Sequence, residues 1–173
     1  MRKLRMKKII IATMLLFLLA SSAFALRIDD PAPLFSLRDI KDVDFYLSDL
    51  VGVARNKKNN GVILSFFASW CVPCRSELPL INSLVDELKD KGIKIVIVGF
   101  KEDFDTIGSL LAELKVDKPV VLCDRDGKVG EKYGVRFLPT TFFIGSDGRV
   151  KDVVFGEIKD KKELREKAGK LSK

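Results

Sequence analysis

Histidine is absent from the 173-residue sequence, and its absence excludes several kinds of active site. Without an imidazole there is no Ser-His-Asp or Cys-His catalysis, no haem ligation by histidine, and no zinc site of the common cysteine and histidine type. The sequence also lacks the glycine-rich phosphate-binding loops of the Walker and Rossmann types. Any catalytic chemistry must therefore come from other residue types.

Cysteine is scarce as well, with three residues in the chain. Three cysteines without histidine do not make a closed four-ligand metal site, so we expect no metal site. Cys71 and Cys74 form a Cys-x-x-Cys motif, whereas Cys123 stands alone at the end of a predicted strand. A free cysteine is most often a buried small hydrophobe, which is the favoured interpretation of Cys123. A reactive or regulatory thiol is the alternative.

Acidic residues are missing from the first 25 positions, where five basic residues lie. These five supply most of the net charge of +7 and leave +2 for the rest of the chain. No concentrated basic surface remains, so we do not expect nucleic acid as a partner. The length indicates a single domain, and an apolar content of 47% is sufficient for one core.

Residues 1–25 have the pattern of an export signal: a basic start, an apolar stretch at 9–20, and Ala23-Phe24-Ala25 as a small-x-small cleavage site. The apolar stretch is shorter than the roughly 20 residues that a membrane span needs. A retained N-terminal membrane anchor is nevertheless the alternative to cleavage. In both cases we expect residues 26–173 to form a domain that works in the periplasm or elsewhere outside the cytoplasm, where a disulfide persists.

The downstream sequence predicts alternating strands and helices. A short hairpin is expected within 35–47, and an amphipathic helix from about 73 to 92 with Pro79 as a kink. The other predicted strands are 62–67, 93–100, 119–123, 141–144 and 150–155, and the other predicted helices are 106–114, 128–133 and 160–171. This order favours an α/β fold with a mostly parallel central sheet, covered on both faces and ending in an antiparallel hairpin.

The Cys-x-x-Cys motif lies where a predicted buried strand becomes a helix, which is typical of a redox-active dithiol. The unpaired N–H groups and the dipole of a helix N-terminus stabilise a thiolate there. We therefore expect Cys71 to attack a substrate disulfide and Cys74 to resolve the mixed disulfide. A purely structural disulfide would close only a tiny loop, and half of a metal knuckle would need a second pair of ligands.

Glu77 and Pro139 are further candidate residues. Glu77 follows Cys74 by three positions, so the two side chains share one side of the helix. Beside an apolar strand the carboxyl would have a raised pKa and could exchange a proton with Cys74. By spacing alone, a solvated surface glutamate is equally favoured. Pro139 begins a predicted strand, where a proline is ordinary.

Three segments together resemble the TlpA/ResA-like branch of the thioredoxin superfamily: Trp70-Cys71-Val72-Pro73-Cys74, Glu77-Leu78-Pro79, and Gly134-Val135-Arg136-Phe137-Leu138-Pro139-Thr140-Thr141-Phe142. The resemblance covers about residues 31–171. It implies a thioredoxin fold with an N-terminal β-hairpin and a central α/β insertion near 103–123. It also implies a cis Leu138-Pro139 peptide packed against the dithiol, substrate binding by Trp70, Leu138 and Pro139, and a functional Glu77.

Two positions depart from thioredoxin itself. Ser65 stands where thioredoxin has a buried aspartate, which fits a branch that supplies its acid from the helix instead. The dipeptide between the cysteines is Val72-Pro73, whereas thioredoxin has Gly-Pro and some ResA-like proteins have Glu-Pro. Because this dipeptide tunes the reduction potential, the direction of electron flow does not follow from the resemblance.

We expect an exported thiol-disulfide oxidoreductase that reduces protein disulfides without an organic cofactor. The resemblance suggests the haem-binding cysteines of apocytochrome c as substrate, hence a role in cytochrome c maturation, and a membrane thiol transporter of the DsbD/CcdA kind as electron donor. General reduction of periplasmic proteins is the closest alternative. A periplasmic dithiol oxidase, a peroxiredoxin and a non-catalytic copper or zinc carrier are the others.

Overall fold

The computed structural model describes residues 26–53 and 59–172. Its elements are β1 (Ser36–Arg38), β2 (Asp44–Tyr46), η1 (Leu47–Asp49), β3 (Gly61–Phe67), α2 (Val72–Asp90), β4 (Ile93–Phe100), α3 (Phe104–Leu114), β5 (Val120–Asp124), α4 (Lys128–Lys132), β6 (Thr140–Gly145), β7 (Val150–Phe155), α5 (Lys161–Ala168) and η2 (Gly169–Ser172). The expected export signal lies outside the described residues. Within them, none of the helices combines the length and the apolar character needed to cross a bilayer.

The central sheet has the strand order β5-β4-β3-β6-β7. β3 pairs parallel with β4, and β4 pairs parallel with β5. β6 runs antiparallel to both of its neighbours, β3 and β7. The predicted α/β architecture is thus confirmed, with β6 and β7 forming the antiparallel hairpin at one edge.

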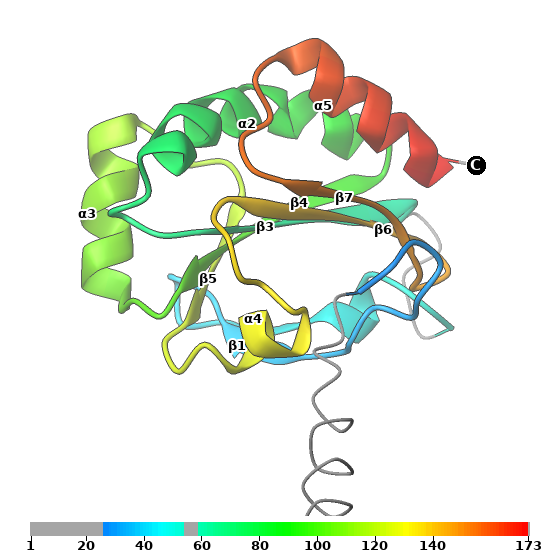
Figure 1. Ribbon diagram of the computed structural model, residues 1–173, viewed down its shortest axis with the longest axis horizontal. Coiled ribbons are helices and arrows are strands. Elements are labelled where there is room, and N and C mark those ends of the chain that lie inside the picture. The colour runs from blue at the N-terminus through cyan, green and yellow to red at the C-terminus, as the bar shows by residue number, and fades with distance from the viewer. Residues whose placement is uncertain (1–25, 54–58, 173) are drawn as a thin grey trace, which may run out of the picture.

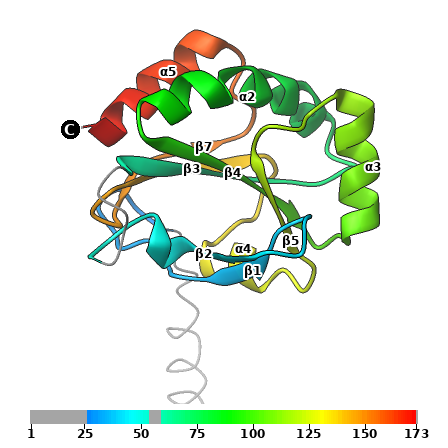
Figure 2. The ribbon, with the colours of Figure 1, turned by 180° about the vertical axis from the view of Figure 1, so that it is seen from behind.

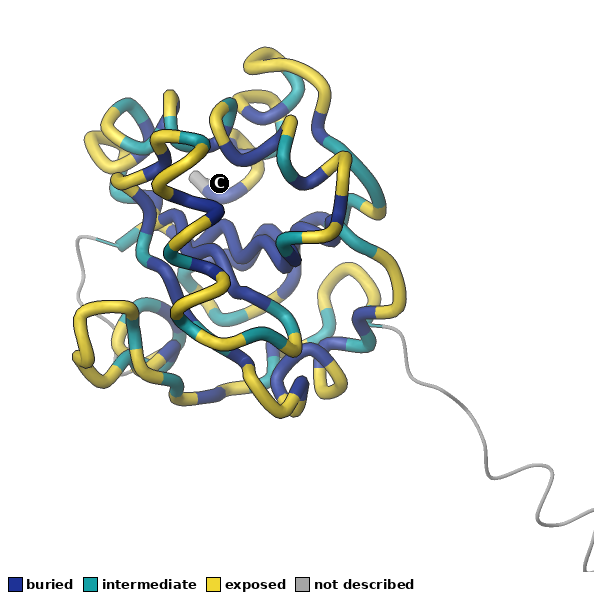
Figure 3. The backbone as a smooth tube through the Cα atoms, turned by 90° about the vertical axis from the view of Figure 1, so that its left-hand side faces the viewer, coloured by how far each residue is buried: buried dark blue, intermediate teal, exposed yellow. Residues whose placement is uncertain are grey.

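Helices and a small second sheet cover the two faces of the central sheet. In Figures 1 and 2, α2 and α5 lie over one face, while α4 and the β1–β2 hairpin lie over the other. The two faces bury separate apolar clusters, and alternate residues of β3 enter each: Ile63 and Phe67 face α2, whereas Val62, Leu64 and Phe66 face the hairpin. Figure 3 shows the strands as a buried interior. Burial on both sides explains the nearly continuous apolar run of β3.

Helix α2 begins at the end of β3 and carries the candidate dithiol. Pro73 lies in its first turn, where the missing proline N–H would have no partner in any case. Its apolar face packs on the sheet through Leu78, Ile81, Leu84 and Leu88. Pro79 lies inside the helix, which continues past it to Asp90. The kink expected at Pro79 stays a prediction.

The predicted insertion and the N-terminal hairpin lie next to each other. α3 and β5 form the insertion, and β5 extends the sheet beyond β4. The hairpin strands β1 and β2 pair antiparallel. An isolated bridge between Asp39 and Leu122 joins the hairpin to β5. The thioredoxin fold with these two additions is therefore confirmed.

Candidate active site

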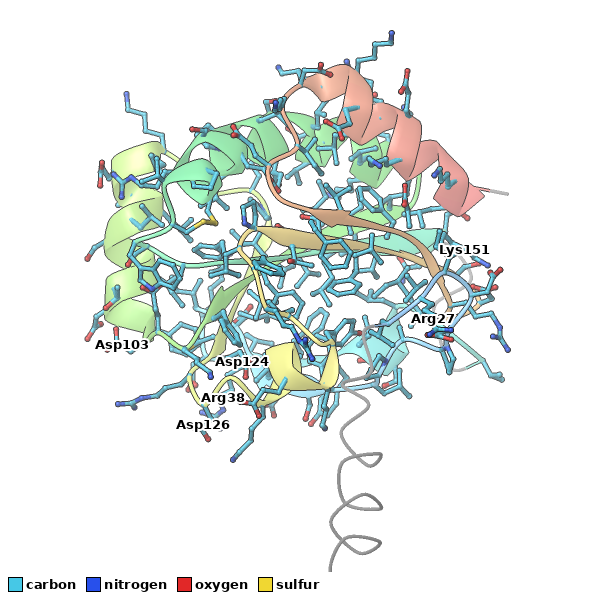
Figure 4. All side chains as sticks on the ribbon, viewed as in Figure 1. Arg27, Arg38, Asp103, Asp124, Asp126 and Lys151 are labelled. Carbon is cyan, nitrogen blue, oxygen red and sulfur yellow. A yellow bond between two sulfur atoms is a disulfide. The ribbon has the colours of Figure 1, made fainter. Side chains whose placement is uncertain are left out.

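Cys71 and Cys74 form a disulfide at the N-terminus of α2, with their Cα atoms 5.3 Å apart. Figure 4 shows it as the yellow bond beside the start of this helix. Cys71 is the N-cap residue, and the backbone N–H of Cys74 donates a hydrogen bond to its Sγ at 3.3 Å. The helix N-terminus thus directs an N–H group at this sulfur, as a thiolate requires.

The disulfide is nearly covered, although its neighbours along the chain are exposed. Cys71 is 4% exposed and Cys74 is 1% exposed, whereas Trp70 and Val72 are 71% and 73% exposed. The attacking cysteine of such a pair should be more exposed than the resolving one, and the difference between Cys71 and Cys74 has this direction but is small. The reason is that both sulfurs pack into the apolar cluster between α2 and the sheet.

Glu77 is buried one turn after Cys74, with an exposed fraction of 1%. The backbone N–H of Ile158 donates to its Oε2 at 3.0 Å. The hydroxyls of Ser65 and Thr141 lie 3.4 Å and 3.3 Å from its Oε1. Burial, assisted by the charge of Glu157, raises the pKa of Glu77 to about 7, while the three hydrogen bonds oppose the rise. The predicted burial and raised pKa are confirmed, and the solvated alternative is wrong.

The Leu138–Pro139 peptide is cis, as the resemblance implied. Pro139 is buried, and its carbonyl accepts a hydrogen bond from the N–H of Gly156 at 2.8 Å. Leu138 is half-buried and packs against the cluster that contains both cysteines. Next to it, Phe137 is 68% exposed. Leu138 of the cis peptide thus packs on the same apolar cluster as the dithiol. Packing of the peptide against the dithiol itself, and substrate binding by Trp70, Leu138 and Pro139, stay predictions.

Sequence reasoning missed Glu102, which lies just beyond the end of β4. Its carboxylate accepts a hydrogen bond from the backbone N–H of Ser69 at 2.8 Å and another from the Ser69 hydroxyl. Ser69 stands two residues before Cys71, so Glu102 anchors the segment that leads into the dithiol. The sequence could have indicated this contact, because the carboxyl ends of adjacent parallel strands meet at one edge of a sheet, and Ser69 follows β3 while Glu102 follows β4.

Cys123 contacts the backbone of Glu102. Its thiol donates to the Glu102 carbonyl at 2.9 Å, and burial raises the pKa of the thiol. It also lines a cavity of about 550 Å³ between β1 and the β5–α4 connection, to which neither Cys71 nor Cys74 contributes. A half-buried thiol with a raised pKa fits a small apolar residue better than a nucleophile. Within residues 26–53 and 59–172, no group of three or more acidic, cysteine or histidine side chains is placed to hold a metal.

A family model described as the AhpC/TSA family matches residues 28–153. The chain belongs to this family. It is 33% identical to the thiol-disulfide oxidoreductase ResA of Oceanobacillus iheyensis, over 91% of this chain and 85% of that one. It is 38% identical to the ResA of Bacillus subtilis, over 72% of this chain and 65% of that one.

A solved structure supports the same assignment. A thiol:disulfide interchange protein DsbE from Chlorobium tepidum superposes with a TM-score of 0.73 at 31% identity, covering 85% of this chain and 99% of that one. Together with the Cys71–Cys74 disulfide, these likenesses confirm the resemblance to the ResA-like branch of the thioredoxin superfamily. This member of the AhpC/TSA family is a thiol-disulfide oxidoreductase.

Proposed function

We propose that the protein works outside the cytoplasm as a reductant of protein disulfides, with Glu77 as the acid–base partner of Cys74. The observation that carries the proposal is the buried carboxyl of Glu77, which has a pKa of about 7. Glu77 lies one helical turn after Cys74, and the Cys71–Cys74 disulfide lies at the N-terminus of the same helix. A general acid or base is most effective when its pKa is close to the working pH. A solely structural disulfide would have no use for such a group.

The reaction starts from the dithiol. The Cys71 thiolate attacks one sulfur of a substrate disulfide, forming a mixed disulfide and releasing the other substrate sulfur as a thiolate. Glu77 then accepts the proton of the Cys74 thiol, and the Cys74 thiolate attacks the Cys71 sulfur. The intramolecular disulfide forms and the second substrate thiolate leaves. Two electrons pass to the substrate, and Glu77 returns its proton to a departing thiolate.

The location and the partners belong to the same proposal. The signal-like pattern of residues 1–25 supports export, with cleavage after Ala25 or retention as an anchor. The likeness to ResA supports apocytochrome c as a substrate and a membrane thiol donor of the DsbD/CcdA kind as the source of electrons. The exposed apolar residues Trp70, Val72 and Phe137, which flank the dithiol and the cis-proline loop, provide a surface for a protein substrate.

A trapping experiment tests the assignment of the two cysteines. The probe is an oxidised peptide with a Cys-x-x-Cys-His sequence, the spacing of a haem attachment site. The Cys74→Ser variant should accumulate a mixed disulfide through Cys71, and the Cys71→Ser variant should not. Capture by Cys71→Ser instead would reverse the two roles. Equal capture of a peptide with an unrelated disulfide would favour general reduction over cytochrome c maturation.

A further inference from the structure

Two buried hydroxyls form a pair above the Glu77 carboxyl. Ser65 on β3 and Thr141 on β6 are register partners, and they are 1% and 0% exposed. The Thr141 hydroxyl lies 2.9 Å from the Ser65 hydroxyl. Both hydroxyls also lie within hydrogen-bonding reach of Oε1 of Glu77, that of Thr141 at 3.3 Å and that of Ser65 at 3.4 Å.

The two residues interrupt strands that are otherwise apolar on this face. Ile63 and Phe67, two positions before and after Ser65, belong to the apolar cluster under α2. A buried hydroxyl is costly unless it is hydrogen-bonded, and a valine or alanine would fill these positions without that cost. The polar partner that Ser65 and Thr141 share is Glu77. Their polarity is therefore explained by the carboxyl that they contact.

Hydroxyls suit a carboxyl that gains and loses a proton. A carboxylate only accepts hydrogen bonds, whereas a carboxylic acid must also donate one. The Ile158 N–H can serve only the accepting oxygen, but a hydroxyl can either donate or accept. We propose that Ser65 and Thr141 are positioning residues of the reaction, whose hydroxyls donate to Glu77 when it is charged and accept from it when it is neutral. The inference rests on the proposed function, in which Glu77 exchanges a proton with Cys74.

The direction of the effect on the Glu77 pKa follows from these contacts. Hydrogen bonds to a charged group are stronger than those to a neutral one. The loss of a hydroxyl therefore destabilises the charged carboxylate form of Glu77 more than its protonated form. The pKa of Glu77 should therefore rise when Ser65 or Thr141 loses its hydroxyl. Among the described residues, the other ionisable group that acts on Glu77 is Glu157, from the β7–α5 connection, whereas Cys71 and Cys74 are joined in a disulfide in the oxidised chain. None of these is changed by the substitutions.

The first measurement is a ¹³C NMR titration of the Glu77 side-chain carboxyl in the oxidised full chain. The midpoint should rise by about one pH unit in Thr141→Val and in Ser65→Ala, because each loses one hydrogen bond to a charged group. Thr141→Ser keeps a hydroxyl and should keep the midpoint. Tyr133→Phe is the matched control, since it removes another core hydroxyl, which bonds to the Pro33 carbonyl at 2.9 Å. An unchanged midpoint in both Thr141→Val and Ser65→Ala would overturn the proposal.

The second measurement separates this inference from the function on which it rests. The pH profile of single-turnover reduction of the peptide disulfide should move to higher pH in Thr141→Val and Ser65→Ala, in step with the midpoint, and should not move in Tyr133→Phe. If Glu77→Gln keeps the profile of the unaltered chain, the proposed role of Glu77 fails. If Glu77→Gln changes the profile while Thr141→Val and Ser65→Ala leave both the midpoint and the profile unmoved, the proposed role of Glu77 stands and only the role proposed for the two hydroxyls fails. Should Thr141→Val not fold, the smaller change Ser65→Ala decides.

Discussion

Glu77 derives its properties from the residues that pack over it rather than from its position in α2. Glu87 lies on the same helix, pairs with Arg165 and Lys91, and has a pKa lowered to about 2. Glu77 faces the sheet, loses its hydration, and has a pKa raised to about 7. Two glutamates on one helix therefore differ in acidity because one meets cations at the surface and the other meets an apolar interior.

Replacing Glu77 should slow the chemical step. In Glu77→Gln, Cys74 loses its proton acceptor, so resolution of the mixed disulfide should slow by about 10²-fold, the usual contribution of a general base. The measurement is single-turnover release of reduced peptide at neutral pH. Glu87→Gln, on the same helix and away from the dithiol, should leave this rate unchanged. A rate in Glu77→Gln equal to that of the unaltered chain would remove Glu77 from the mechanism.

The raised pKa of Glu77 should also make the folded protein less stable at high pH. The pKa in the folded state, about 7, exceeds the ordinary value of 4.5, so the folded state binds this proton more tightly than the unfolded state does. The stability that the bound proton contributes is complete below the unfolded pKa and is lost as pH rises through the folded one.

Urea unfolding of the oxidised protein at about pH 4 and about pH 8 checks this. From about pH 4 to about pH 8, the unaltered chain should lose about 3 kcal/mol of unfolding free energy through Glu77, and Glu77→Gln should not show this loss. Other groups titrate in both proteins, so their effects cancel in the comparison. An equal change in the free energy of unfolding of both proteins between the two pH values would contradict the prediction.

At the scale of the elements, α2 supplies the second cysteine, the acid and much of the core. Truncating its buried side chain in Ile81→Ala should lower the free energy of unfolding by about 2–5 kcal/mol, through lost apolar burial and a cavity. Ser83→Ala, at an exposed position of the same helix, is the control and should change it little. Thermal or urea unfolding measures both. Equally small losses of unfolding free energy in Ile81→Ala and Ser83→Ala would mean that α2 does not pack as described.

The sequence predicted elements well where local signals and burial agreed. β4 spans the expected residues because it is apolar except at the exposed Lys94 and because Gly92, with its positive φ, separates it from α2. The second hairpin strand is shorter than expected, because Leu47 turns into η1 and is fully buried there. The first helix was predicted to end near residue 92, and α2 ends at Asp90 with Lys91 as its cap, two residues before the left-handed Gly92.

The site was only partly readable from the sequence. The dithiol could be found because its residues are adjacent along the chain. The pairing of Ser65 with Thr141 depends on the register of two strands that are 76 positions apart. The anchoring of Ser69 by Glu102 likewise depends on which strands are neighbours. Spacing along one helix could not decide whether Glu77 faces water, because the answer depends on elements from elsewhere in the chain.

At the scale of the whole molecule, the reduction potential decides the direction of electron flow. A reductant should have a value near that of thioredoxin, about −270 mV, rather than the roughly −120 mV of a strong oxidant. Equilibration with a series of thiol–disulfide buffers, followed by quantification of the Cys71–Cys74 disulfide, measures it. A potential close to −120 mV would exclude the reductant and indicate a dithiol oxidase.

The connection between β7 and α5 reaches both sides of the active site. The N–H of Gly156 donates to the carbonyl of Pro139, and two residues later the N–H of Ile158 donates to Glu77. New chain ends or an inserted segment between these two residues would uncouple the acid from the cis-proline loop, even though no side chain of the site had been changed.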